Sequence, residues 1–313
     1  MNNLSKYLNY GYTNRPSKYL SKVLPDRLIL LLFVDNYYLK EISSEEKAKK
    51  IIVPKINSNN NFVNELKQLC DKYNLEKSIA LAIFGSIASE EIISYSDFDG
   101  ILIYDEKEFA SHDKIKKLKN LIQEINLISH LQDILQHHRI IVIGKQELIE
   151  NPDDITYHLL KESKLVYGLN EIKISNQSKA DYRHSLTKLI NSIQNKLSQD
   201  QLWMNQYFFK NLLSELLLLP CSYLQYQHQK YISKKDSFEL IKSHFESSDQ
   251  SIINKLENIR ANWIQKEISK SELNKNKIEN LKANSITQVE FITILSELKS
   301  DLQLLLTRIK PND

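Results

Sequence analysis

The chain has few cysteines and no long hydrophobic run. Its two cysteines, Cys70 and Cys221, are far apart in apolar helical patterns, which predicts buried free thiols in a reducing compartment and excludes a disulfide framework. The longest apolar runs, Leu28 to Val34 and Leu216 to Leu219, are too short to span a bilayer. The first residues are polar and tyrosine-rich, unlike a signal peptide. We therefore expect a cytoplasmic protein with no membrane partner.

The chain also lacks a strong charge of either sign. Its formal net charge is only +3, which is too small to argue for nucleic-acid binding. From residue 171 onward, 20 Lys and Arg residues stand against 16 Asp and Glu residues, so this part is mildly basic. Its charges are scattered and form no basic stripe with interleaved aromatic residues. The length of 313 residues and the 42% hydrophobic content are typical of a globular protein with one large or two medium domains.

Glycine is scarce, with five residues in the chain, and one of them follows a buried-strand pattern. The run Ile79–Phe84 is almost entirely apolar, which predicts a buried strand, and Gly85 and Ser86 come directly after it. Gly85 allows the backbone to turn and to approach a ligand closely. We expect the Ser86 hydroxyl and the free N–H groups of a short helix after Gly85 to bind the phosphates of a nucleotide.

Two carboxylates follow ten residues later, at the start of a second apolar run. Asp97 and Asp99 are separated by one residue, so on a strand their side chains would point to the same side. Such a pair repels itself unless a divalent cation lies between the carboxylates. Two-metal phosphoryl transfer uses this arrangement to hold the cation against the phosphates.

The sequence resembles the nucleotidyltransferase superfamily related to DNA polymerase β. The resemblance lies in three consecutive parts, which are Phe84-Gly85-Ser86, a spacer of ten residues, and Asp97-Phe98-Asp99. The similarity covers roughly residues 62 to 168 and extends to the stand-alone bacterial, antibiotic-modifying members. Ser96 before the first aspartate is common in that family, whereas Gly100 replaces an apolar residue. The resemblance implies an α+β fold, with a small mixed-sheet core followed by an all-α helical bundle. It also implies Mg²⁺ or Mn²⁺ as cofactor, an NTP as substrate, and Gly85, Ser86 and Ser96 as nucleotide-binding residues.

The family usually carries a third carboxylate on a later strand, as metal ligand and base. Asp133 is our candidate, because it precedes the expected strand Ile140–Ile143 and is followed by apolar positions. Gln136, His137 and His138 lie just before that strand and are possible additional site residues, as phosphate contacts or as a base. Satisfied local hydrogen bonds are an equally good interpretation of these histidines. A zinc site is not expected, since no cysteine is near and the spacing fits no zinc finger.

The pattern divides the chain into an N-terminal helical extension (1–60), a nucleotidyltransferase catalytic domain (61–170) and a C-terminal helical bundle (171–313). We expect helices at Asp26–Ile42, at residues 61–75 and at Asp154–Gly168, a linker at Ser43–Asn61, and four to six helices in the bundle. By resemblance to antibiotic nucleotidyltransferases, Lys234 and Lys235 are candidate phosphate contacts, although two solvated lysines before a helix start fit the sequence better.

Three functions agree with these residues. The first is transfer of a nucleoside monophosphate from an NTP to a hydroxyl of a small-molecule, antibiotic-like acceptor, with release of pyrophosphate. The second keeps the chemistry but uses an RNA end or a protein as acceptor, in a toxin–antitoxin or defence system, which the mildly basic C-terminal half favours slightly. The third is a catalytically degenerate nucleotide-binding partner protein. The intact Gly-Ser and Asp-x-Asp elements argue against the third.

Overall fold

The computed structural model describes residues 48–57, 60–150, 154–174, 180–264 and 268–311. The expected helix Asp26–Ile42 lies outside these residues. The chain forms two compact units, which we call the first unit and the second unit. The first unit comprises residues up to 92, 96–132 and 138–178, and the second comprises 179–313 with the short segments 93–95 and 133–137.

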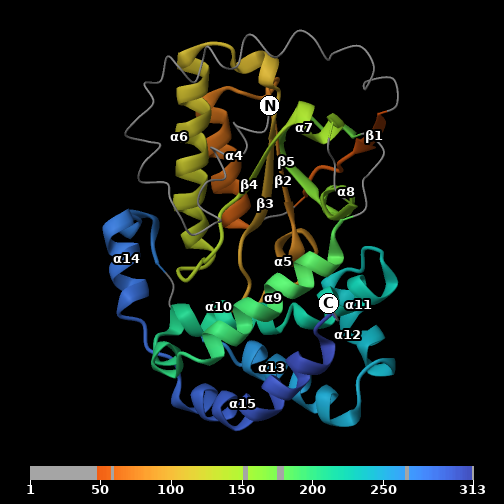
Figure 1. Ribbon diagram of the computed structural model, residues 1–313. Helices are drawn as coiled ribbons and strands as arrows, with labels where there is room; N and C mark the ends of the chain where they lie inside the picture. Colours follow the sequence, from red (N-terminus) through yellow and green to blue (C-terminus); the bar gives the residue numbers. More distant parts are fainter. Residues whose placement is uncertain (1–47, 58–59, 151–153, 175–179, 265–267, 312–313) are drawn as a thin grey trace, which may run out of the picture. The chain divides into compact units, whose positions relative to one another are not determined.

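A four-stranded mixed sheet forms the centre of the first unit (Figure 1). Its strands follow the order β4-β3-β2-β5, in which β3 runs parallel to β4 and antiparallel to β2, and β2 is antiparallel to β5. The strands are β2 (Ile79–Phe84), β3 (Asp99–Tyr104), β4 (Ile141–Gly144) and β5 (Lys164–Gly168).

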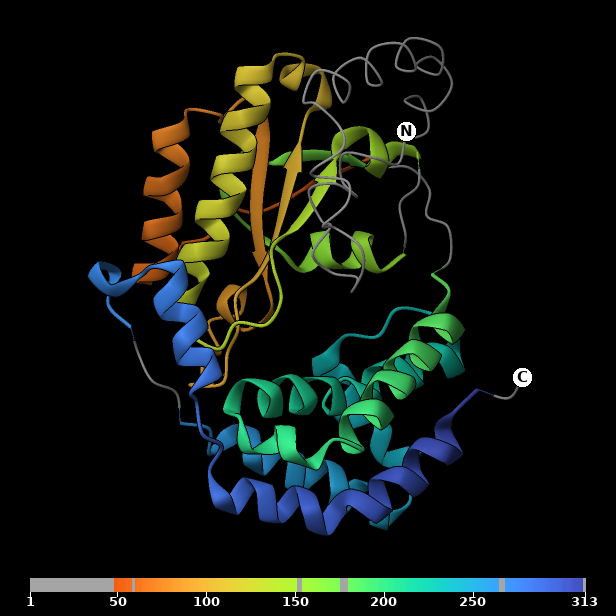
Figure 2. The ribbon, with the colours of Figure 1, turned by 60° about the vertical axis from the view of Figure 1, so that its left-hand side comes forward.

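Two long helices cover one face of this sheet, α4 (Asn61–Tyr73) and α6 (His112–Ile128). They lie side by side in both views (Figure 2). Alternate residues of β2, Ile79, Leu81 and Ile83, join the hydrophobic core with these helices, as the period of two along a strand requires.

The other alternate residues of β2, Ala80 and Ala82, belong to a second core on the opposite face. That core includes Leu148 and Leu160 from two short helices and Ile172 from a two-stranded antiparallel sheet. These elements are α7 (Lys145–Glu150), α8 (Asp154–Glu162), β1 (Lys49–Ile52) and β6 (Glu171–Ile174). The central sheet is therefore buried on both faces, which explains why its strands are almost continuously apolar.

The structure confirms the expected order of helix, strand, turn, strand, helix and strand, but it changes two elements. The expected helix Asp154–Gly168 ends at Glu162, and its last residues form β5 next to β2. The run Leu165-Val166-Tyr167 fits a buried strand, and Gly168 (φ +86°) lies too close to the Ile79 carbonyl for a side chain. The expected linker Ser43–Asn61 contains strand β1, whose partner β6 is distant in sequence.

The second unit is helical and contains seven α-helices among its described residues, compared with the four to six expected. Helix α14 lies in a lysine-rich stretch of the chain. The seven are α9 (Tyr182–Leu197), α10 (Gln206–Leu216), α11 (Leu219–His228), α12 (Lys234–Leu240), α13 (Ser247–Ala261), α14 (Lys275–Ala283) and α15 (Val289–Ile309). Short 3₁₀ turns lie at Glu106–Phe109 and Ser129–Leu131 in the first unit, and at Asp200–Met204, Ile241–Ser243 and Lys270–Glu272 in the second unit.

Stacked aromatic rings of Phe209, Trp263 and Phe291 lie in the core of the second unit. The fold is α+β, with a mixed sheet in one unit and helices in the other, as expected from the sequence. In the described part of the chain, no helix has both the length and the apolar character needed to cross a membrane.

Candidate active site

The two carboxylates of the Asp-x-Asp motif lie at the start of β3. The strand begins at Asp99, whose backbone pairs with Phe84, so Asp97 lies just before the strand rather than on it. Phe98 between them is buried and packs edge-on against Phe62, with ring centroids 5.2 Å apart. The side chains of Asp97 and Asp99 keep exposed fractions of 12% and 34%. The apolar residue of the motif thus anchors the segment in the core, while the carboxylates remain accessible.

Gly85 brings the preceding turn directly against one of these carboxylates. Its φ of +68° is a left-handed conformation that favours glycine. A Cβ atom at this position would lie only 2.7 Å from Asp99 Oδ2. The Gly-Ser turn and the Asp-x-Asp motif are therefore packed together without space for a side chain between them, and glycine is required for both reasons.

The turn after Gly85 is compact and internally hydrogen-bonded. Helix α5 (Gly85–Ala88) is a single turn, after which Ser89 N–H donates to the Gly85 carbonyl and Glu91 N–H to the Ser86 carbonyl. Glu90 also adopts a positive φ, of +62°. Ser86 is half-buried at the start of this turn, as expected from the sequence. Ser96, also expected as a nucleotide-binding residue, is buried beside Asp97, with 5% of its surface exposed.

His138 lies beside both carboxylates. Its Nε2 atom is 3.3 Å from Asp99 Oδ1 and 3.6 Å from Asp97 Oδ2. The parallel pairing of β3 with β4 accounts for this position, because Ile101 is opposite Ile141 and the segments preceding the two strands meet at one edge of the sheet.

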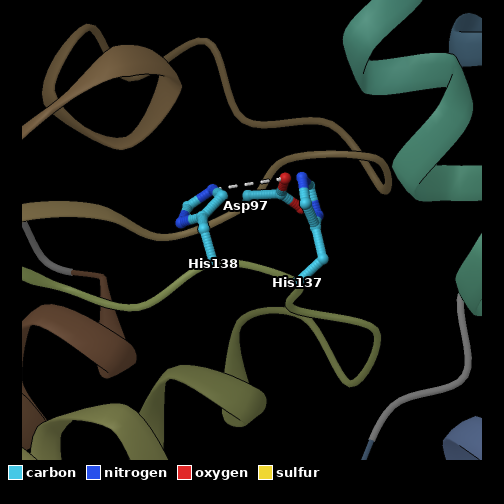
Figure 3. A group of neighbouring side chains, drawn as sticks. All are labelled: Asp97, His137 and His138. Atoms are coloured by element: carbon cyan, nitrogen blue, oxygen red, sulfur yellow. Dashed lines mark ion pairs between the residues drawn. The ribbon is translucent and has the colours of Figure 1, made fainter. Parts of the chain in front are cut away.

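Asp97, His137 and His138 form a group that could hold a metal ion, since one ligand atom from each lies within 4.8 Å of the others. Figure 3 draws these side chains and marks the ion pair between Asp97 and His138. Sequence reasoning named both histidines only as additional residues. The signal that could have ranked them higher is their place immediately before a strand parallel to β3.

Asp133, the expected third carboxylate, has a different environment in the second unit. Its side chain is fully buried and forms an ion pair with Lys210, at 2.8 Å, whose side chain is also fully buried. Asp133 Oδ1 also accepts a hydrogen bond from Leu135 N–H. The Lys210 ammonium lies 4.6 Å from the centre of the Tyr95 ring. Sequence reasoning missed Lys210, although a lysine inside the apolar stretch Leu202 to Tyr226 was the available signal.

Three other candidate residues, Gln136, Lys234 and Lys235, belong to the second unit. Gln136 is buried, and its backbone carbonyl accepts a hydrogen bond from the Lys282 ammonium. Lys234 and Lys235 form the first turn of α12, which is capped by the Ser233 hydroxyl through Asp236 N–H.

Comparison with solved structures gives a distant structural likeness. No family model matches the chain, and no curated protein matches it in sequence. Among solved structures, the chain is similar to the spectinomycin adenyltransferase from Enterococcus faecialis, determined with ATP and spectinomycin, at 12% identity and a TM-score of 0.37. The match covers 77% of this chain and 98% of that chain.

Proposed function

We propose that this protein transfers a nucleoside monophosphate from an NTP to a hydroxyl group of a small-molecule acceptor. The observation that carries the proposal is the packing of Gly85 against Asp99. A Cβ atom at Gly85 would lie 2.7 Å from Asp99 Oδ2, so this left-handed turn leaves no space for a side chain beside a carboxylate that, with Asp97, forms a partly exposed pair. Nucleotidyl transfer needs this combination, since the backbone that receives the phosphates must lie beside the carboxylates that hold their counter-ion.

The residues present fit a divalent cation. Asp97 and Asp99 provide hard oxygen ligands, which Mg²⁺ and Mn²⁺ prefer, and both side chains are accessible. When bound, such an ion neutralises charge that develops on the phosphates during transfer. We assign Asp97 and Asp99 to hold it.

The turn at Gly85 and Ser86 receives the triphosphate in this proposal. The glycine keeps the backbone free of a side chain at the point of approach, and the Ser86 hydroxyl is available to donate to a phosphate oxygen. In the reaction, the acceptor oxygen bonds to the α-phosphorus while the bond from that phosphorus to the bridging oxygen breaks. Pyrophosphate leaves, and the proton of the acceptor hydroxyl passes to water.

We assign Asp133 a structural role. A carboxylate that is fully buried in an ion pair with a fully buried lysine is already neutralised by a protein cation. This supports its omission from the metal ligands.

The experiment that tests the proposal is transfer of label. The purified protein is incubated with each of the four α-³²P NTPs, Mg²⁺ or Mn²⁺, and separate acceptor pools of aminoglycosides and lincosamides, total RNA, and lysate protein. Asp97→Asn/Asp99→Asn protein runs alongside. Label in a small molecule that disappears with the variant supports the proposal. Label in RNA or protein keeps the chemistry but replaces the acceptor, and no label in any pool from folded protein contradicts nucleotidyl transfer.

A further inference from the structure

The third side chain at the carboxylate pair is a histidine. His138 Nε2 lies 3.6 Å from Asp97 Oδ2 (Figure 3). The same ring atom lies 3.3 Å from Asp99 Oδ1. All three residues belong to the first unit. Their side chains are between 12% and 34% exposed.

These separations suit a shared ion better than direct pairing. A charge-assisted hydrogen bond between nitrogen and a carboxylate oxygen is about 2.7–2.9 Å long, and both separations at Nε2 exceed that length. Two neighbouring ligand atoms around one octahedral cation, each about 2.1 Å from it, lie about 3 Å apart. One Nε2 atom near two carboxylate oxygens at slightly more than this spacing therefore needs little movement to bind a common ion.

The fold holds His138 at this position. Three residues after it, β4 begins at Ile141, which is paired with Ile101 of β3. Just before the strand, Ile140 N–H donates to the Asn126 side chain at the end of α6, at 3.0 Å. The histidine is thus attached to the same sheet that positions Asp97 and Asp99.

From this geometry we infer that His138 is the third ligand of the cation in the proposed active site and that it makes the site prefer Mn²⁺ over Mg²⁺. The inference rests on the metal site of the proposed function and adds its ligand set and metal selectivity. Mg²⁺ strongly prefers oxygen ligands and gives up its water reluctantly. Mn²⁺ shares the oxygen ligands of Mg²⁺. As a first-row transition ion it also accepts an imidazole nitrogen more readily, so one nitrogen beside two carboxylates shifts the balance toward Mn²⁺.

The test measures metal binding without nucleotide, so that it does not depend on activity. Mn²⁺ is titrated into metal-free full-length protein, free Mn²⁺ is followed by electron paramagnetic resonance, and Mg²⁺ is then added as competitor. Pulsed experiments on bound Mn²⁺ report coupling to ¹⁴N, a direct sign of an imidazole ligand. We expect Mn²⁺ to bind at least about tenfold more tightly than Mg²⁺, with ¹⁴N coupling present.

Three variants test whether His138 is the source of the ¹⁴N coupling and of the preference for Mn²⁺. His138→Ala should weaken Mn²⁺ binding at least about tenfold and remove the ¹⁴N coupling. His138→Asp should retain binding but bring the Mn²⁺ and Mg²⁺ affinities closer together, because an oxygen ligand replaces the nitrogen. His112→Ala, at the first residue of α6, is the matched control and should behave as wild type.

Two results would overturn the inference. One is unchanged Mn²⁺ affinity or retained ¹⁴N coupling in His138→Ala, and the other is equal affinity of the wild type for both ions. Loss of transfer in His138→Ala with unchanged Mn²⁺ binding would instead make the residue a phosphate contact or a base. If ¹⁴N coupling depends on His138 but no NTP is ever used, the ligand assignment stands and the proposed function fails, so the two failures are distinguishable.

Discussion

In the first unit, the side chains of Asp97 and Asp99 lie beside a histidine and are 12% and 34% exposed, whereas in the second unit Asp133 is fully buried against Lys210. All three aspartates precede or begin an apolar segment, so they look alike in the sequence. The difference between them is the source of the neutralising charge. Asp133 has a cation from its own chain, and the accessible pair can take one from solution.

This difference implies different consequences for mutation. A buried ion pair is destabilising when one partner is removed, because the remaining charge has no water around it. An accessible pair of like charges contributes little to folding and is retained for binding. Four substitutions test the contrast, and they follow in order of expected effect.

The largest effect is expected on activity in the first unit. Asp97→Asn/Asp99→Asn should reduce nucleotidyl transfer at least about 10³-fold, because both cation ligands lose their charge. The free energy of unfolding of the metal-free protein should change by no more than about 1 kcal/mol. Label transfer and urea unfolding measure the two quantities. A loss of several kcal/mol would mean that the pair is structural, and the comparison would fail.

The opposite outcome is expected for Asp133→Asn in the second unit. Leaving the Lys210 ammonium buried without its carboxylate should cost about 3–5 kcal/mol of stability, measured by urea unfolding. The double variant Asp133→Leu/Lys210→Met should recover most of that loss, because no buried charge remains. Asp200→Asn, which breaks the exposed ion pair with Lys299, is the matched control and should cost less than about 1 kcal/mol.

A wild-type-like stability of Asp133→Asn, combined with lost transfer, would restore Asp133 as a catalytic candidate. That result would favour the expectation from the sequence over the structural role assigned above.

The sequence predicted the first unit well where the signal was local. The apolar run of β2 and the glycine after it follow from hydrophobicity and from backbone freedom, whereas the period of two put Asp97 on a strand that in the structure begins only at Asp99. The helix of residues 61–75 was placed within two residues, ending where Asn74 adopts a left-handed conformation. These features depend on neighbours in the chain, which a sequence pattern records directly.

The sequence could not predict features that depend on distant partners. Strand β1 forms because β6 lies beside it, more than a hundred residues later, and β5 is a strand because β2 offers it an edge. The same limit applies to the site. The position of His138 depends on the parallel pairing of β3 with β4, and the burial of Asp133 depends on Lys210. Neither partner is visible in local periodicity.

Gly85→Ala tests how closely the turn and the accessible pair depend on each other. A left-handed conformation disfavours alanine, and the new Cβ would lie 2.7 Å from Asp99 Oδ2. We expect a loss of about 1–3 kcal/mol in stability and at least a tenfold loss of transfer. Urea unfolding and label transfer measure these losses.

A double-mutant cycle with Asp99→Ala separates the loss of stability in Gly85→Ala into a steric part and a backbone part. Without the carboxylate, the steric part disappears and only the backbone part remains, so Gly85→Ala should destabilise the Asp99→Ala protein less than the wild type. Equal costs in both backgrounds would show that the turn and Asp99 are independent, against the packing on which the proposed function depends.

The smallest effect of substitution is expected at Glu106. We compare its carboxylate with the partly exposed pair Asp97 and Asp99 and with the fully buried Asp133. Burial raises the pKa of Glu106 to about 7, and the negative charges of Asp105 and Glu147 act in the same direction. The N–H of Gln146 donates to both Glu106 oxygens, at 3.1 Å each, and opposes this rise in pKa. Glu106 is thus less buried than Asp133, and its pKa rises because burial outweighs the opposing hydrogen bonds.

Because the pKa of Glu106 is higher in the folded state, the folded protein binds more protons than the unfolded chain between pH 4.5 and about 7. Its contribution to stability is therefore fully present below pH 4.5 and is lost as the pH rises to about 7, by about 1–3 kcal/mol. Glu106→Gln should remove this decline, so that the variant gains stability over the wild type at pH 8 but not at pH 4.5. Urea unfolding across this range measures it, with the exposed Glu108→Gln as control. If Glu106→Gln declines with pH as the wild type does, then burial without a cation does not penalise a carboxylate here, and the distinction between Asp133 and the accessible pair loses its physical basis.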